Sequence, residues 1–190
     1  MKRILPLLIS LAIAAPVLAA GKAATAPVIV IKTSLGTMKA ELYPDKAPIT
    51  VKNILQYVDD KFYDGTIFHR VIPGFMIQGG GFDKDMAKKP TRASIKNESF
   101  NGLKNERGTL AMARTPDPDS GSSQFFVNTV NNAFLDKANS QDGFGYCVFG
   151  KVTEGLDVLD KIKAVPTGVK DGMRDVPTTP VVIESIRRDQ

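Results

Sequence analysis

The sequence is poor in the side chains that carry out most enzymatic chemistry. Its 190 residues include one cysteine, one histidine and no tryptophan. The single cysteine, Cys147, excludes an intramolecular disulfide and any cysteine-rich metal site. The single histidine, His69, excludes metal motifs that need two imidazoles. Hydrophobic residues make up 43% and charged residues 24%, which is typical of a globular domain and excludes a disordered chain, a collagen-like repeat and a polytopic membrane protein.

Motifs for nucleophilic catalysis and phosphate binding are also missing. A Ser-His-Asp triad would have to use His69, and no Gly-x-Ser-x-Gly turn is present to expose a serine. Gly79-Gly80-Gly81 lacks the Gly-Lys-Ser/Thr ending of a phosphate-binding loop. Cys147 lies in an apolar run, which favours a packed thiol over a nucleophile. These absences nearly exclude a barrel hydrolase, and we expect neither a cofactor nor a metal.

The N-terminus has the pattern of a secretory signal peptide. Lys2 and Arg3 precede an apolar run over residues 4–18, which ends at Ala19-Ala20-Gly21. The alternative, an uncleaved anchor, is disfavoured because the run of about 15 residues is shorter than the roughly 20 that a spanning helix needs. We therefore predict a signal peptide over residues 1–19, with cleavage after Ala19 or Ala20, and a flexible lead-in over residues 20–27.

The positive charge does not indicate a nucleic-acid partner. The formal net charge is +5, and Lys2 and Arg3 account for two of these charges. The densest basic stretch, residues 84–92, contains no aromatic side chains that could stack on bases. We expect a solvated loop there, no nucleic-acid partner and, after removal of the leader, no membrane partner.

The rest of the chain alternates short apolar runs with turns rich in glycine, proline and asparagine, a pattern typical of β-strands. The predicted strands are Val28–Lys32, Thr37–Tyr43, Thr66–Ile72, Phe75–Gly80, Thr109–Arg114, Gln124–Thr129, Tyr146–Val152 and Val181–Arg187. Helical spacing of apolar residues predicts helices over Pro48–Asp60 and Leu156–Ala164. Consecutive short strands with two helices favour a mainly antiparallel β-barrel.

Strand alternation predicts which side chains share a face. The sets predicted to lie on one face are Phe68, Arg70 and Ile72, then Met76 and Gln78, then Gln124, Phe126 and Asn128. The opposite faces carry His69 and Val71, then Ile77, then Phe125 and Val127. The last two of these faces are apolar and suit a barrel core. If the mixed faces adjoin, they form an apolar patch with one arginine and two glutamines on the outside of the barrel, as in a binding site.

Three segments resemble the cyclophilin family of peptidyl-prolyl cis-trans isomerases. They are Phe68-His-Arg-Val-Ile-Pro-Gly-Phe-Met-Ile-Gln-Gly-Gly80, Ser123-Gln-Phe-Phe-Val127 and Phe149-Gly-Lys-Val152. The resemblance implies one isomerase domain over residues 28–188, folded as a closed eight-stranded antiparallel β-barrel capped by two α-helices. With its leader, the chain is similar to the exported bacterial members, which implies a location in the periplasm.

The resemblance also implies the functional residues. It assigns catalysis to Arg70 and Gln124. The substrate-binding residues that it implies are Phe75, Met76, Gln78, Ala113, Arg114, Phe126, Phe134, Leu135 and Tyr146.

Three positions depart from the best-known eukaryotic pattern. Phe134 replaces a tryptophan that hydrogen-bonds cyclosporin, so we expect weak or no binding of that drug. Tyr146 replaces a pocket histidine, and Arg114 replaces an asparagine.

The implied reaction suits a chain with so little histidine and cysteine. Rotation about an X-Pro bond crosses a barrier of roughly 18–20 kcal/mol without moving a proton or breaking a covalent bond.

The implied partners are proline-containing unfolded or flexible polypeptides. A monomer is expected because no heptad or dimerisation helix is evident. A binding module that holds such segments without turnover stays open. The presence of Arg70 and Gln124 favours turnover, because a module that only binds proline-containing segments needs the apolar pocket more than the positive charge of the arginine.

Overall fold

The computed structural model describes residues 26–189. The predicted signal peptide and residues 20–25 of the predicted lead-in lie outside the described residues. In the part of the chain that is described, no helix has both the length and the apolar character needed to cross a membrane.

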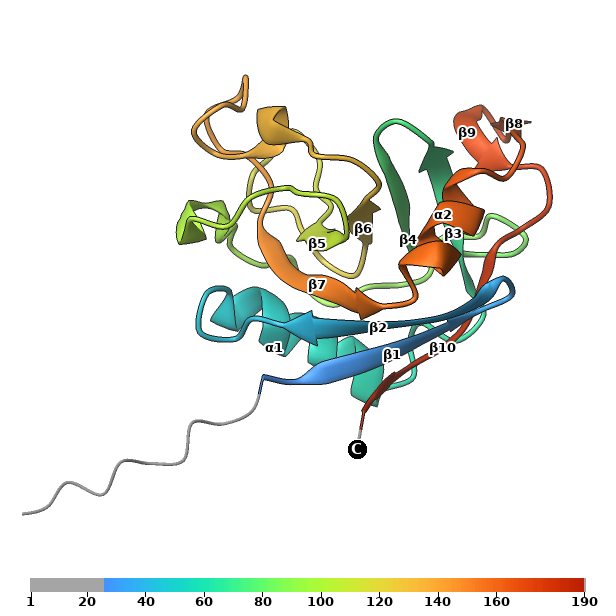
Figure 1. Ribbon diagram of the computed structural model, residues 1–190, viewed down its shortest axis with the longest axis horizontal. Coiled ribbons are helices and arrows are strands. Elements are labelled where there is room, and N and C mark those ends of the chain that lie inside the picture. Colours follow the sequence, from blue (N-terminus) through green and yellow to red (C-terminus); the bar gives the residue numbers. More distant parts are fainter. Residues whose placement is uncertain (1–25, 190) are drawn as a thin grey trace, which may run out of the picture.

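Eight antiparallel strands close into a barrel in the order β1-β10-β3-β4-β6-β5-β7-β2 (Figure 1). The barrel strands are β1 (Val28–Thr33), β2 (Gly36–Leu42), β3 (Thr66–Ile72), β4 (Met76–Asp83), β5 (Thr109–Met112), β6 (Phe125–Asn128), β7 (Val148–Glu154) and β10 (Val182–Arg188). The predicted closed eight-stranded barrel is confirmed, and each strand lies within a few residues of its predicted bounds.

Two α-helices pack against the barrel. Helix α1 (Pro48–Asp59) lies against β10, and helix α2 (Leu156–Lys163) lies against β2. Proline suits the first turn of α1 because the amide hydrogen that it lacks has no partner there. Two short 3-10 helices, η1 (Ser99–Asn101) and η2 (Ala133–Leu135), lie in the connections. Both predicted α-helices are confirmed, and each ends one residue earlier than expected.

The two faces of the sheet carry two separate apolar clusters. The larger cluster fills the barrel and contains Ile77, Phe125 and Val127. The smaller cluster, on the opposite face, contains Met76 and Phe126. The alternation predicted for β4 and β6 is therefore confirmed.

For β3 the predicted alternation is wrong at Phe68, which is fully buried in the barrel core. In the pairing with β4, Phe68 lies opposite Gly79 and Arg70 lies opposite Gln78, so His69 is an extra residue. This β-bulge shifts the strand by one residue and turns Phe68 inward. The Phe68 ring meets the Phe125 ring edge-on, with centroids 6.2 Å apart.

One hairpin lies outside the barrel, and the sequence did not predict either of its strands. Strands β8 (Thr167–Lys170) and β9 (Met173–Pro177) form a separate two-stranded sheet. Their turn, Asp171-Gly172, has positive φ angles of 49° and 77°, as tight hairpin turns require. Only Val176 and Pro177 of the two strands are buried, so the segment has almost no apolar periodicity.

Candidate active site

A hollow of about 90 Å³ opens on the outer face of the sheet, over the adjoining strands β3, β4, β6 and β5. Its lining consists of Arg70, Phe75, Met76, Gln78, Ala113, Arg114, Phe126, Leu135 and Tyr146. These are nine of the eleven residues predicted for catalysis and substrate binding. Whether each has the predicted role stays a prediction; the fold brings the nine together.

The floor and one wall of the hollow are apolar and tightly packed. Met76, Phe126 and Leu135 are buried in the outer cluster. The Tyr146 ring meets the Phe126 ring edge-on, with centroids 5.6 Å apart. The hollow therefore has an apolar side beside its polar residues Arg70, Gln78 and Arg114.

Gln124 does not line this hollow but lies in an adjoining one of about 230 Å³, which shares Gln78, Ala113 and Arg114 with the first. Its Oε1 accepts a hydrogen bond of 2.9 Å from Gln78 Nε2. Gly81 makes room for this side chain, because a Cβ atom at position 81 would lie 2.5 Å from Gln124 Cγ. The sequence does not reveal this role of Gly81, because nothing in the glycine run indicates which side chain crosses it.

Phe134, the other predicted residue that does not line the hollow, lies at its rim. Its ring is 57% exposed and stacks on Phe75, with centroids 5.6 Å apart and an angle of 29° between the planes.

Buried amides hold the rim in place. Asn132 Nδ2 donates to the Phe75 carbonyl oxygen at 2.8 Å and to Asn128 Oδ1 at 2.7 Å. Asn128 Nδ2 in turn donates to Thr109 Oγ1 at 2.9 Å. The connection after β6 is thus fixed to β5 and to the turn that carries Phe75. The sequence does not indicate these supports, because the partners lie on β6, the loop after it, β5 and the turn before β4.

Arg70 reaches the hollow with its hydrogen-bond donors free. Its side chain is 43% exposed. Among residues 26–189, its guanidinium contacts one carboxylate, with Arg70 Nε 4.0 Å from Asp175 Oδ2, and makes no hydrogen bond. Its donors therefore remain available to a bound molecule.

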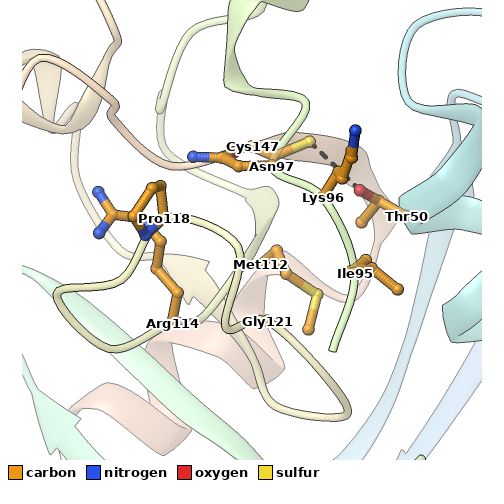
Figure 2. A pocket seen from close by; sticks show the side chains of 9 residues that line it. All are labelled: Thr50, Ile95, Lys96, Asn97, Met112, Arg114, Pro118, Gly121 and Cys147. Atoms are coloured by element: carbon orange, nitrogen blue, oxygen red, sulfur yellow. Dashed lines mark hydrogen bonds between the residues drawn. The ribbon is translucent and has the colours of Figure 1, made fainter. Parts of the chain in front are cut away.

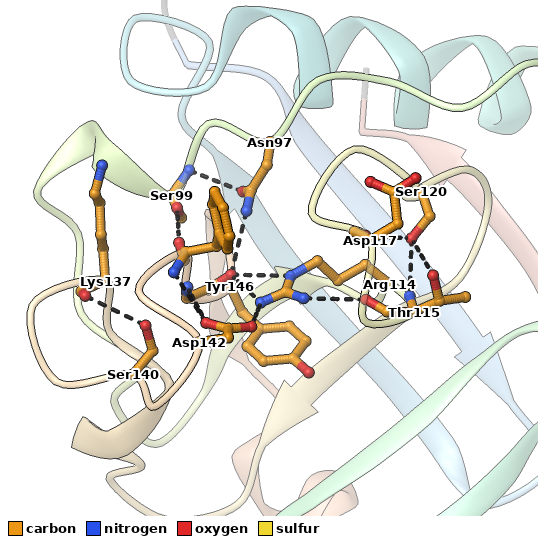
Figure 3. Close-up of polar contacts among 12 residues, drawn as sticks. Asn97, Ser99, Arg114, Thr115, Asp117, Ser120, Lys137, Ser140, Asp142 and Tyr146 are labelled. Carbon is orange, nitrogen blue, oxygen red and sulfur yellow. Dashed lines mark hydrogen bonds and ion pairs between the residues drawn. The ribbon is translucent and has the colours of Figure 1, made fainter.

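Arg114, the second arginine at the hollow, is bound into the surrounding loops (Figure 3). Its side chain is 3% exposed, and its three guanidinium nitrogens donate to the carbonyl oxygens of Thr115 and Gly145 and to the carboxylate of Asp142. The guanidinium also lies 4.3 Å from the centre of the Tyr146 ring. The hydrogen bond from Arg114 lowers the pKa of Asp142. Arg114 therefore shapes the wall of the hollow while its donors are occupied.

His69, the extra residue of the β3 bulge, is buried against Phe82, with ring centroids 4.7 Å apart. Its Nδ1 atom has no hydrogen-bond partner in the described part of the chain. Burial, together with the neighbouring charge of Arg70, lowers the pKa of His69 to about 4. His69 is thus neutral near pH 7, and it is not among the residues that line the hollow.

Cys147 is a packed thiol, as its apolar surroundings predicted. Burial raises its pKa to about 12, and its Sγ lies 3.6 Å from Thr50 Oγ1. The two side chains border a cavity of about 10 Å³ (Figure 2). That volume is barely sufficient for one water molecule, so the cavity is too small for a substrate.

Comparisons with known proteins agree with the geometry. Residues 28–188 match the family model described as "Cyclophilin type peptidyl-prolyl cis-trans isomerase/CLD". The chain is 57% identical over 157 residues to a peptidyl-prolyl cis-trans isomerase of Acinetobacter baylyi, covering 83% of this chain and 82% of the relative. It is 54% identical over 159 residues to peptidyl-prolyl cis-trans isomerase B of Escherichia coli, covering 83% and 97%.

A similar solved structure is that of a cyclophilin type peptidyl-prolyl cis-trans isomerase from Cryptosporidium parvum, determined in the presence of the dipeptide Ala-Pro. It is 27% identical in sequence, with a TM-score of 0.70, and the likeness covers 86% of this chain and 99% of that one.

The burial of His69 predicts how stability depends on pH. Its pKa is about 4 in the folded chain and 6.5 for a free histidine, so the unfolded chain takes up the proton first as the pH falls. The contribution of His69 to the free energy of unfolding is therefore complete above pH 6.5 and decreases towards pH 4. Urea unfolding should show a loss of about 2 kcal/mol between about pH 7.5 and about pH 5.

The control is His69→Phe, which retains a ring against Phe82 and cannot be protonated. Its free energy of unfolding should change much less over the same range. Equal slopes for the two proteins would contradict this account.

Proposed function

The chain belongs to the cyclophilin family and is a peptidyl-prolyl cis-trans isomerase, and on this basis we propose that Arg70 accelerates rotation about X-Pro bonds by hydrogen bonding to the twisted imide nitrogen. One observation carries the proposal. Of the two arginines that line the hollow, Arg114 has its nitrogens engaged by the protein, whereas Arg70 has free donors beside an apolar pocket.

The free guanidinium matches the electronic change during rotation. In the planar X-Pro bond, resonance delocalises the nitrogen lone pair into the carbonyl group. In the twisted transition state the resonance is lost, and the nitrogen regains a lone pair that can accept a hydrogen bond. Arg70 is always charged and presents rigidly placed donors. It therefore binds the twisted form more strongly than either planar form, which is the condition for catalysis.

The apolar hollow supplies the second part of the mechanism. Met76, Phe126 and Leu135 hold the proline ring still while the preceding carbonyl group rotates. The same surface removes water from the planar bond, which is the more dipolar form and loses more solvation. Each lowering of the barrier by about 1.4 kcal/mol raises the rate tenfold, so several modest effects give a large acceleration.

Polar groups beside the hollow orient the substrate. Gln78 and Gln124 are joined by a hydrogen bond of 2.9 Å, and each retains amide groups for a peptide backbone. We assign Gln124 a supporting role in catalysis, because it borders the adjoining hollow rather than the one with Arg70.

We further propose that the substrates are exported polypeptides that are unfolded or flexible around proline, and that the enzyme acts in the periplasm. The support is the N-terminal sequence: two basic residues, an apolar run and small residues at the end. Prolines in unfolded chains populate the cis form at about 10–30% and isomerise slowly. A catalyst of this step suits a compartment in which newly exported chains fold.

Loss of the Arg70 guanidinium should slow turnover. Exchange NMR on an Ala-Pro test peptide should show that Arg70→Ala lowers the catalysed isomerisation rate about 100-fold, comparable to the loss of a hydrogen-bond donor to a transition state. Peptide affinity should change far less, because the apolar pocket is intact. The matched control is Arg188→Ala, which removes an arginine of similar exposure that is paired with Asp59.

This experiment also separates an isomerase from a binding module. A pure clamp would bind the peptide in both forms and would leave the exchange rate at its uncatalysed value. That result would contradict the proposed role of Arg70.

Export should remove the N-terminal segment. When the full chain is expressed in a Gram-negative host, the periplasmic protein should begin at Ala20 or Gly21 by N-terminal sequencing. An intact N-terminus at Met1 in the cytoplasmic fraction would contradict the proposed export.

A further inference from the structure

The hairpin outside the barrel, β8–β9, adjoins the strand that carries Arg70. Strand β9 lies alongside β3, although the two belong to different sheets (Figure 1). Residues from the hairpin can therefore reach the side chains that leave β3 on its outer face.

Both strands are irregular where they come together. In β3 the extra residue His69 directly precedes Arg70. In the hairpin, Gly168 pairs with Val176 and Lys170 with Met173, so one residue of β8 faces two of β9. Asp175 is one of those two, with φ of 62°. Bulges of this kind redirect side chains, and they are common next to active sites.

The two redirected side chains are oppositely charged and face each other. Arg70 Nε and Asp175 Oδ2 are 4.0 Å apart, and the two side chains are 43% and 42% exposed. In the described part of the chain, no other carboxylate comes as close to this guanidinium. The backbone conformation at residue 175 is one that few residues other than glycine, asparagine and aspartate adopt at low cost.

The distance between Arg70 Nε and Asp175 Oδ2 determines the kind of interaction between the two side chains. At 4.0 Å it is an electrostatic attraction and not a hydrogen bond, so it leaves the arginine donors free. The closest approach is on the Nε side of the guanidinium. Neither Nη group has a hydrogen-bond partner among the described residues, and the attraction at Nε favours the rotamers that keep the guanidinium beside Asp175. An arginine that is already oriented loses less entropy when it meets the transition state.

We propose that Asp175 is a positioning residue for Arg70: two bulges bring the carboxylate to the Nε side of the guanidinium and hold its free donors towards the hollow. This inference rests on the proposed function, since it assigns no role to Asp175 apart from Arg70. It predicts an effect on the rate of rotation of the bound peptide, with little effect on peptide affinity.

The test is Asp175→Asn, which retains the shape and tolerates the same backbone conformation. Its kcat for an Ala-Pro peptide should fall about two- to fivefold, the range expected for an exposed ion pair, with KM nearly unchanged. Raising NaCl from about 20 mM to about 1 M should lower the kcat of the natural protein to the level of the variant. The variant should be insensitive to salt over that range.

The matched control is Asp171→Asn, the same chemical change in the turn of the same hairpin, also at positive φ. Its kcat and salt dependence should equal those of the natural protein. Equal losses in the two variants would overturn the proposal, because they would indicate a general effect of the hairpin. An unchanged kcat in Asp175→Asn would also overturn it.

A double-mutant cycle separates this inference from the proposed function. Adding Asp175→Asn to Arg70→Ala should cause no further loss, because the carboxylate acts only through the arginine. A further loss of two- to fivefold would overturn the positioning role. Full activity in Arg70→Ala alone would instead refute the proposed role of Arg70.

Discussion

The arrangement of the hollow depends on the β-bulge at His69. The bulge turns Phe68 into the barrel core, where it meets Phe125, and leaves Arg70, two residues later, on the outside. The same extra residue places an imidazole in a buried position beside Arg70, and burial together with the Arg70 charge lowers the pKa of His69 and so favours its neutral form. A neutral His69 adds no second positive charge beside the arginine. The bulge therefore packs Phe68 into the core and leaves the Arg70 guanidinium at the surface without a second positive charge next to it.

The two arginines at the hollow have different tasks, and their contacts explain the difference. Arg114 ties two loops together through Thr115, Asp142 and Gly145, and it stacks on Tyr146. With its donors engaged, it fixes the wall of the pocket. Arg70 has no such bonds within the described chain and is the group that can respond to a bound peptide. In the proposed mechanism a rigid pocket and a free donor act together, because catalysis needs stronger binding of the twisted form than of the planar forms.

Much of the fold is predictable from the sequence, because short apolar runs separated by turn residues mark all eight barrel strands. Alternation also gives the two faces of β4 and β6. The hairpin β8–β9 is not predictable, since only Val176 and Pro177 are buried there. For the site, the family resemblance supplies the nine residues that line the hollow. It does not supply the inward turn of Phe68, which depends on pairing between strands rather than on the local pattern. Nor does it indicate the contacts of Arg114 with Asp142 and Gly145 or the approach of Asp175 to Arg70, since these partners lie far apart along the chain.

The most direct test of the account compares Arg70→Lys with the natural protein. Lysine retains the positive charge but lacks the planar set of donors. Exchange NMR on a saturating Ala-Pro peptide measures the rotation rate of the bound peptide, and titration gives its Kd. We predict rotation at least about tenfold slower in Arg70→Lys, with a Kd within about twofold of the natural value. Rotation at the natural rate in this variant would show that charge alone suffices and would contradict the account.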